Sequence, residues 1–276
     1  MLSQGCTPGS PQQTGSGIDA TQAAAEGTDP LAEFRESVVG GAAAPPKPVR
    51  TSPPAENDFI ALILGNSHIG GGAPFPQLMT MIKARPNMDE VEYQPLSGPF
   101  LDFLESAAQT PSLFEPFPPQ YVILQGQKYS TSGRNEYPID AAIRMVEQFN
   151  RRGCRVLLMP EWRTEGNVGE AQRVSKIYER IADEAKLERP DVPVEVVPVG
   201  LVWDRVLDEM PELELYAGDG NHAGNQGGYL TALTFYCWLY DAPPESEVPE
   251  SLQAVGNRLT ETALEVCRQY RAARKH

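Results

Sequence analysis

Short runs of apolar residues alternate along this chain with longer stretches in which apolar residues recur at helical spacing. Five runs have strand character: Phe59–Leu64, Val91–Gln94, Tyr121–Leu124, Arg155–Met159 and Val194–Val197. Between them lie helical patterns at Gln77–Ala84, Ile139–Arg151 and Val168–Leu187. Near-continuous apolar strands are typical of a parallel sheet covered on both faces, and strand–helix alternation is typical of crossover connections. The pattern therefore predicts a single doubly wound α/β domain, with about five parallel strands and helices on both faces of the sheet.

The first 57 residues have a different composition from the rest. Gly and Pro make up about a quarter of them, a share typical of low-complexity segments. The remainder is mostly Ala, Ser, Thr and Gln, which offer too little apolar surface to compensate for the entropy lost on ordering. We therefore expect residues 1–57 to form a disordered tail or linker and residues 58–276 to form the folded domain.

The segment Leu2–Cys6 loosely resembles the end of a bacterial lipoprotein signal, in which the cysteine is lipidated. The charged and apolar regions that precede such a cysteine are missing here. A longer precursor with lipid at Cys6 would place the protein in the cell envelope or periplasm. A chance resemblance and a cytoplasmic location remain the alternative.

Net charge argues against one class of partner. The chain has 37 Asp and Glu residues against 23 Lys and Arg, a net charge of -14. Such a surface repels a phosphate backbone, so we expect no binding of nucleic acid. No uninterrupted apolar stretch reaches the roughly 18 residues needed to span a bilayer, so we expect no membrane-spanning helix. The sequence does not predict the oligomeric state.

The four cysteines and three histidines form neither a CxxC pair nor a Cys/His cluster. We therefore expect no metal site and no cofactor. Cys154, Cys237 and Cys267 lie in apolar or helical context, where a small buried side chain is commoner than a disulfide partner. The cysteines therefore do not show whether the protein works in an oxidising or a reducing compartment.

Polar segments follow several predicted strands, at the edge of a parallel sheet where ligands bind. These segments are Gly65–Gly72 (GNSHIGGG), Ser97–Phe100, Gln125–Lys128 and, before a strongly apolar helix, Asp219–His222. The first fits neither GxGxxG nor GxxxxGK[ST], which disfavours a nucleotide site. Taken alone, Ser67 fits a turn residue, and Asp219 with His222 fits a helix N-cap followed by a surface histidine. Their combination favours a catalytic site.

In this order the segments resemble the blocks of the SGNH, or GDSL-like, hydrolase superfamily. The likeness is to its bacterial branch, whose first block reads GNS[HF] and whose third reads LQxQ. It extends from Phe59 to near the C-terminus, and the first and last blocks carry most of it. The resemblance implies a flavodoxin-like SGNH hydrolase fold with Ser67 as nucleophile and His222 and Asp219 as its partners.

The resemblance also implies an oxyanion hole. Its donors would be the backbone N–H groups of Ser67 and Gly98 and the side-chain amide of Gln127, where the family usually has Asn. Each such donor stabilises negative charge that develops in the transition state.

The chemistry of these residue types agrees with the resemblance. A serine hydroxyl needs an adjacent base, and a carboxylate three residues before His222 can reach its Nδ1 atom. His68 is the rival base, but it leaves the turn in another direction from Ser67, so we expect it to line the cleft or to pack against the loop. Trp162 follows the fourth strand and points toward the same edge, either to stack on a sugar ring in the substrate cleft or to pack in the core.

The sequence thus favours a serine esterase that removes a small acyl group, with acetyl on a carbohydrate as the first choice. The expected partner is a small-molecule or carbohydrate ester. The polar, glycine-rich surroundings of Ser67 and the lack of a long apolar lid segment disfavour a lipase. A non-catalytic carbohydrate-binding or scaffold protein, an acyltransferase, a thioesterase and a lipase remain the alternatives, because one fold hosts many functions.

Overall fold

A computed structural model describes residues 52–98, 101, 104–105, 117–129 and 134–274 of the protein. The chain divides into two units, Met1–Lys47 and Pro48–His276, and every described residue belongs to the second. Residues 1–51 of the predicted tail, Cys6 among them, lie outside the described residues, so the expectations about them stay predictions.

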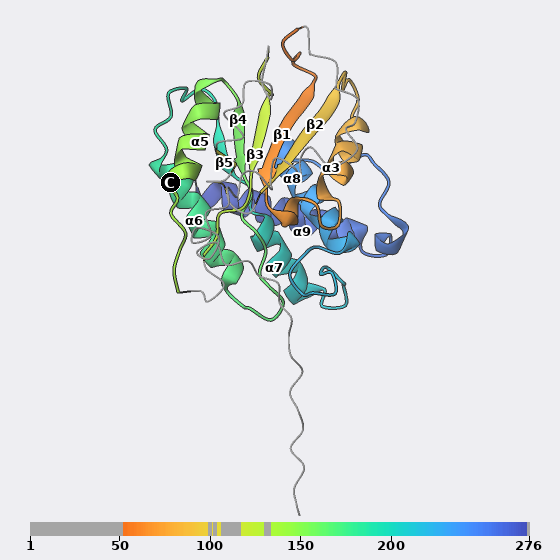
Figure 1. The fold of residues 1–276 in the computed structure, drawn as a ribbon. Coiled ribbons are helices and arrows are strands. Elements are labelled where there is room, and N and C mark those ends of the chain that lie inside the picture. Colours follow the sequence, from red (N-terminus) through yellow and green to blue (C-terminus); the bar gives the residue numbers. More distant parts are fainter. Residues whose placement is uncertain (1–51, 99–100, 102–103, 106–116, 130–133, 275–276) are drawn as a thin grey trace, which may run out of the picture. The chain divides into compact units, whose positions relative to one another are not determined.

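Five strands form one all-parallel sheet in the order β2-β1-β3-β4-β5 (Figure 1). They are β1 (Phe59–Gly65), β2 (Val91–Ser97), β3 (Tyr121–Leu124), β4 (Arg155–Leu158) and β5 (Val194–Val196). This order is the flavodoxin-like one, and the predicted fold class is confirmed. The ends of the central strands are level, because Leu64 pairs with Leu124 and Leu124 with Leu158. Segments that follow these strands therefore emerge at one edge of the sheet.

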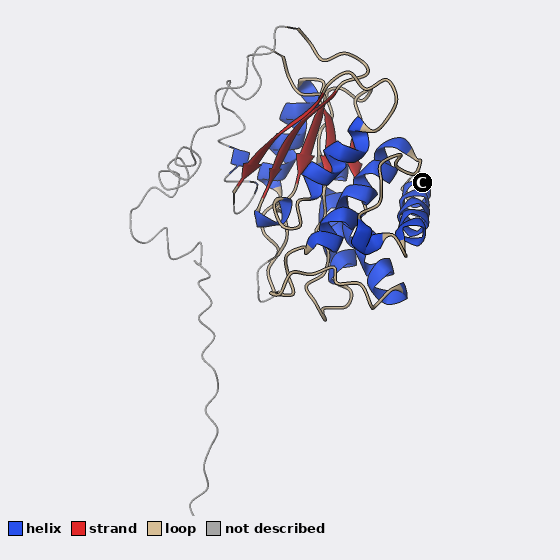
Figure 2. Ribbon diagram, turned by 90° about the vertical axis from the view of Figure 1, so that its right-hand side faces the viewer, coloured by secondary structure: helices blue, strands red, loops and turns tan. Residues whose placement is uncertain are grey.

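Helices lie on both faces of the sheet (Figures 1 and 2). Along β1, Phe59, Ala61 and Ile63 belong to a core shared with α3 (Pro74–Lys83), α7 (Val199–Glu209), α8 (Asn225–Tyr240) and α9 (Gly256–Ala273). The alternate residues Leu62 and Leu64 are also buried, on the opposite face, because successive side chains of a strand point to opposite faces. That second face is covered by the amphipathic helices α5 (Asp140–Arg151) and α6 (Glu170–Glu184).

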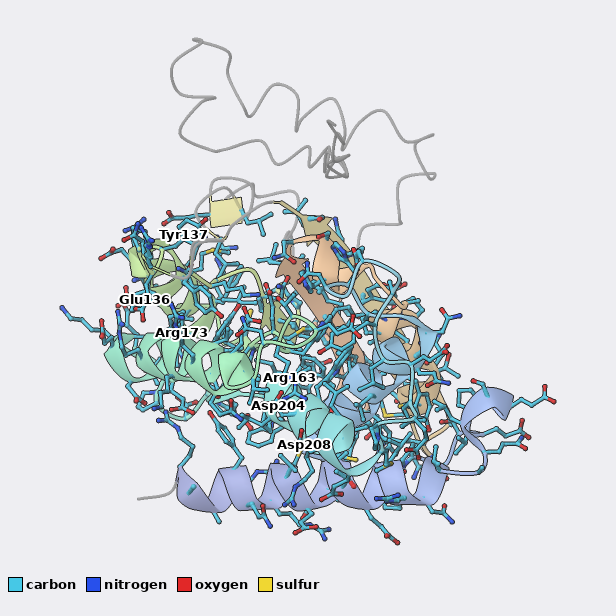
Figure 3. All side chains as sticks on the ribbon, turned by 90° about the horizontal axis from the view of Figure 1, so that it is seen from below. Glu136, Tyr137, Arg163, Arg173, Asp204 and Asp208 are labelled. Carbon is cyan, nitrogen blue, oxygen red and sulfur yellow. The ribbon has the colours of Figure 1, made fainter. Side chains whose placement is uncertain are left out.

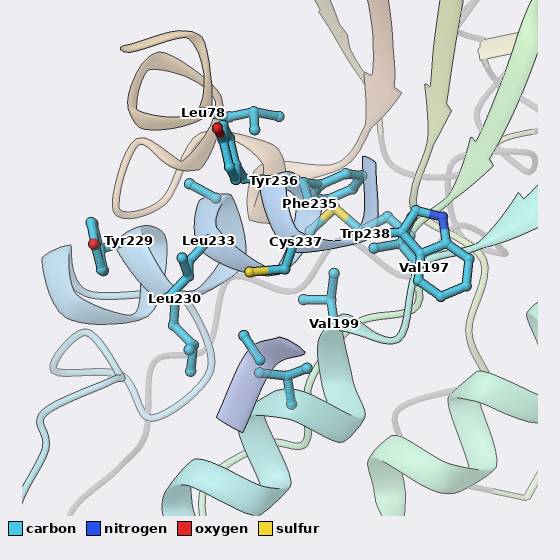
Figure 4. Close-up of a cluster of buried hydrophobic side chains, with 14 of the residues drawn as sticks. Leu78, Val197, Val199, Tyr229, Leu230, Leu233, Phe235, Tyr236, Cys237 and Trp238 are labelled. Atoms are coloured by element: carbon cyan, nitrogen blue, oxygen red, sulfur yellow. The ribbon is translucent and has the colours of Figure 1, made fainter. Parts of the chain in front are cut away.

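The helix α8 has no polar face. Its residues from Gly227 to Trp238 are all buried, and it packs against α3, α7 and α9 (Figure 4). A helix that is apolar all round must be surrounded by other elements, so its position in the fold is fixed. Because the loop with Asp219 and His222 runs directly into α8, this packing also fixes that loop.

Two further expectations concern the described residues. Cys154, Cys237 and Cys267 are free and buried, as expected for small core side chains, and burial raises the pKa of the Cys154 thiol to about 12. None of the described helices is long and apolar enough to cross a membrane.

Candidate active site

The turn after β1 presents a serine at the edge of the sheet. Asn66 caps the short 3-10 helix η1 (Ser67–Ile69), with its side-chain oxygen accepting the N–H of His68 at 2.9 Å. Ser67 is the first residue of η1 and is exposed. Its Oγ atom lies 2.7 Å from Nε2 of His222. The strand end and the cap thus hold the hydroxyl clear of the sheet and against an imidazole.

The second half of the site is the loop before α8. Nδ1 of His222 lies 2.5 Å from Oδ2 of Asp219, and Oδ1 of Asp219 accepts the backbone N–H groups of Asn221 and His222 at 3.0 and 2.9 Å. The hydrogen bond with the His222 side chain, followed by the two backbone bonds, holds the pKa of Asp219 well below its usual range. The structure thus brings Ser67, His222 and Asp219 together in one chain of hydrogen bonds, with an ionised carboxylate at its end.

Glycines allow the two halves of the site to meet backbone to backbone. Gly72 has a φ of 65°, and a Cβ atom there would lie 2.2 Å from the carbonyl oxygen of Gly224. A Cβ atom at Gly228 would lie 1.9 Å from the carbonyl oxygen of Gly72. No side chain fits such spaces without displacing backbone. The glycine run after Ser67 therefore lets the backbone at the start of α8 pack directly against it.

One of the two predicted backbone oxyanion donors is already engaged. The N–H of Gly98 donates to the carbonyl of Gly65 at 2.8 Å, which extends the β1–β2 ladder beyond Ser97. The N–H of Ser67 has no acceptor among the described residues. Of the two groups, the structure therefore leaves only the Ser67 N–H available for a substrate oxygen.

The third predicted donor, the Gln127 side chain, is directed elsewhere. Its side chain is buried, and its Nε2 atom donates to the carbonyls of Tyr137 and Pro138, both at 3.0 Å. Figure 3 shows the position of Tyr137. Both amide hydrogens are used in these bonds, so Gln127 fastens the segment before α5 to β3. Because of this, we do not retain it as an oxyanion donor.

His68 and Trp162 lie beneath the site. His68 is buried, with its ring centroid 4.8 Å from that of His222 and 5.2 Å from that of Trp162. It therefore packs against the loop, one of the two roles expected for it. Trp162 is 1% exposed and stacks on Trp203 at 4.2 Å, so it is a core residue and cannot stack on a sugar ring. Its expected place in the substrate cleft is corrected accordingly.

We expect the burial of His68 to make folding stability depend on pH. Burial lowers the pKa of this imidazole, although Glu161 nearby opposes the effect. An unfolded histidine titrates near pH 6.5, so below that pH the unfolded chain binds a proton that the folded chain takes up only at lower pH. This group's stabilising contribution is therefore full above about pH 6.5 and declines as pH falls toward its folded pKa, by at most about 1.4 kcal/mol per pH unit.

The comparison of the wild type with His68→Gln isolates this effect from other titrating groups. Urea unfolding at pH 7, 6 and 5 should give a wild-type free energy of unfolding that falls relative to that of the variant as pH decreases. A difference that stays constant over this range would contradict the assignment.

A buried carboxylate under the serine turn was not among the predicted site residues. Glu161 follows β4 and is 1% exposed, and its Oε1 atom accepts from Nδ2 of Asn66 at 3.0 Å and from Nε2 of Gln125 at 2.5 Å. The position of Glu161 at a strand end was the sequence signal for it. Its contacts lie far apart along the chain, so the sequence could not distinguish a buried support from a surface charge.

No group of three or more His, Cys, Asp or Glu side chains in the described part of the chain could hold a metal ion. The site that the structure assembles is one of hydroxyl, imidazole and carboxylate groups, a set suited to proton transfer and nucleophilic attack.

No family model matches the sequence, and no curated protein is significantly similar to it. Several solved structures are similar in fold. A DUF4886 family protein from Bacteroides uniformis has a TM-score of 0.53 at 15% identity, over 77% of this chain and 95% of that one. A putative SGNH hydrolase from Slackia heliotrinireducens has a TM-score of 0.46 at 18% identity, over 64% of this chain and 96% of that one. An acetylxylan esterase from Geobacillus stearothermophilus has a TM-score of 0.49 at 14% identity, over 65% and 92%. At 15% identity the likeness to the DUF4886 family protein concerns the fold alone, and it agrees with the α/β architecture of the five-stranded parallel sheet.

Proposed function

We propose that this protein is a serine ester hydrolase in which Ser67 is the nucleophile. The observation that carries the proposal is the pair of hydrogen bonds from Ser67 Oγ to His222 Nε2, at 2.7 Å, and from His222 Nδ1 to Asp219 Oδ2, at 2.5 Å. A hydroxyl in contact with a base that a third group orients is the arrangement used for covalent catalysis.

The reaction follows from this arrangement. Ser67 Oγ attacks the ester carbonyl carbon as its proton passes to Nε2 of His222, which gives a tetrahedral oxyanion. Collapse of the oxyanion breaks the bond to the alcohol, which leaves with the proton from Nε2, and the acyl group stays on Ser67. A water molecule then gives a proton to Nε2 and attacks the acyl-enzyme, and the carboxylic acid is released when the proton returns to Oγ.

Asp219 and the Ser67 backbone support these steps. The ionised Asp219 keeps the proton of the neutral imidazole on Nδ1, leaving Nε2 free to accept, and it stabilises the imidazolium that forms. In this proposal the N–H of Ser67 donates to the oxyanion. One such donor contributes on the order of 3 kcal/mol to the stability of a transition state.

Acetyl remains the first choice of acyl group on the grounds of the sequence, and the openness of the site bears on how the acyl-enzyme reacts. Ser67 is exposed, and the side chains of His222 and Asp219 are 32% and 51% exposed. Water can therefore reach the acyl-enzyme, which favours hydrolysis over transfer of the acyl group to another acceptor. The choice of a carbohydrate as the alcohol rests on the sequence alone, on the polar, glycine-rich surroundings of Ser67, because Trp162 is buried.

The test is a substrate panel on the full chain. It combines p-nitrophenyl esters from acetyl to long acyl chains, acetylated sugars and an acyl thioester, with mass detection of the products. We expect fastest release from acetyl esters and loss of this activity in Ser67→Ala. Cleavage of none of the panel would contradict the proposal and favour a binding protein, and acylation of a sugar in place of hydrolysis would favour a transferase.

A further inference from the structure

Glu161 and Trp162, two consecutive residues beyond β4, contact different halves of the proposed active site. We propose that this pair positions the site, with Glu161 fixing the turn that carries Ser67 and Trp162 fixing the loop that carries His222, so that the two halves meet at hydrogen-bonding distance. This inference rests on the proposed function.

The buried Glu161 carboxylate is surrounded by two amide donors, an ammonium group and an imidazole. Its Oε1 atom accepts from the side-chain amides of Asn66 and Gln125, and its Oε2 atom lies 3.6 Å from Nζ of Lys128 and 3.8 Å from Nε2 of His68. A buried carboxylate persists only where such donors and charges compensate for its lost hydration. The cluster is therefore built around this charge.

The charge sets the orientation of both amides. With Nδ2 of Asn66 turned to Glu161, the Oδ1 atom of Asn66 accepts the His68 N–H and caps η1. With Nε2 of Gln125 turned to Glu161, its Oε1 atom accepts the backbone N–H of Asn66 at 2.8 Å. Rotating either amide would place two oxygens in contact. Glu161 thus holds Asn66, the residue before Ser67, in two ways. It binds the Asn66 side chain directly, and it holds the Asn66 backbone through Gln125.

Trp162 holds the other half. Its Nε1 atom donates to the carbonyl of Asn221 at 2.9 Å, and this residue lies between Asp219 and His222. The indole is stacked on Trp203, with 7° between the two ring planes. Its direction is therefore set by the core, and its N–H fixes the height of the loop above the sheet.

The segment of Glu161 and Trp162 is itself fastened to α7. A Cβ atom at Gly200 would lie 2.4 Å from the carbonyl oxygen of Glu161, so the backbone lies directly on the first turn of that helix. The next residue, Arg163, forms ion pairs with two aspartates on α7 (Figure 3): its Nε atom lies 3.4 Å from Oδ1 of Asp204, and its Nη2 atom lies 3.3 Å from Oδ1 of Asp208. Glu161 and Trp162 are thus both held against α7. A shift of the Ser67 turn on Glu161, or of the His222 loop on Trp162, therefore changes the distance between Ser67 and His222.

The test measures how fast Ser67 reacts with a small fluorophosphonate, in which Oγ displaces fluoride and little substrate binding is involved. Glu161→Gln removes the charge at nearly constant shape, and Trp162→Phe removes the indole N–H but keeps a stacked ring. Trp238→Phe is the matched control, because this buried tryptophan lies near the C-terminal end of α8, where its ring packs against Tyr270 and Arg271. We expect the first two variants to lose between about 10-fold and 100-fold in phosphonylation rate and in kcat, with KM little changed. Trp238→Phe should lower the melting temperature without this loss.

The outcomes separate this inference from the proposed function. A wild type that does not react with the fluorophosphonate would overturn the proposed function and the inference with it. A reactive wild type whose Glu161→Gln and Trp162→Phe variants react at the wild-type rate would overturn the inference alone. Equal rate losses in Trp162→Phe and Trp238→Phe would also overturn it, because the effect would then be general destabilisation. If Glu161→Gln fails to fold, the comparison of the two tryptophan variants decides.

Discussion

Replacing Ser67 by Ala should lower kcat for ester hydrolysis by at least about 10⁴-fold, and replacing His222 by Ala should cost a similar factor. The reason is that Oγ is the attacking atom and Nε2, 2.7 Å away, is the group that takes its proton. Neither step proceeds without the other, so the double variant should be little worse than either single one. The measurement is kcat and KM for p-nitrophenyl acetate with all three variants.

Ser67→Ala should fold normally, because Ser67 is exposed and its side chain contacts the site alone. Ser251→Ala, at an exposed serine in η3 (Glu250–Leu252), is the control and should keep full activity. Losses for Ser67→Ala and His222→Ala that multiply in the double variant would show that the two residues act independently and would contradict the proposed unit.

Replacing Gly228 by Ala should both destabilise the fold and reduce turnover. The new Cβ atom would lie 1.9 Å from the carbonyl oxygen and 2.4 Å from the carbonyl carbon of Gly72, so backbone must move. We expect a loss of about 3 kcal/mol in the free energy of unfolding, at the upper end for an overpacked site. Turnover should fall as well, because the Gly72 loop carries Ser67 and the Gly228 helix follows His222. Urea unfolding and kcat report the two effects.

Gly70→Ala is the matched control from the same glycine run. Gly70 has a φ of -101°, and the nearest atom to a Cβ there is the Ser67 carbonyl oxygen at 3.7 Å. This variant should therefore keep both stability and kcat. If Gly228→Ala behaves in the same way, the two backbones are not in close contact and the glycine run has another cause.

The strands, the buried helix α8 and the segments at the sheet edge could be predicted because each leaves a local pattern. Phe59–Leu64 is apolar throughout because β1 is covered on both faces, and Asp219 and His222 precede an apolar helix that has to be central. These patterns reflect the burial of single elements, and the sequence records such burial directly.

The direction of individual side chains beyond the strand ends could not be predicted. Gln125 and Gln127 belong to one motif, yet the first supports the Ser67 turn and the second binds the carbonyls of Tyr137 and Pro138. Which amide faces the site depends on loops that arrive from elsewhere in the chain. For the same reason the sequence left the place of Trp162 open and identified the glycines after Ser67 without their partner, Gly228.

The central claim is that Ser67 is the nucleophile activated by His222, and locating a covalent adduct tests it most directly. The full chain is treated with a fluorophosphonate, digested, and mapped by mass spectrometry, with His222→Ala treated in parallel. The account predicts a single adduct on the peptide that contains Ser67, at Ser67 itself, and strongly slowed labelling in His222→Ala. An adduct on another residue, or hydrolysis of acetyl esters that persists after Ser67 is fully labelled, would contradict it.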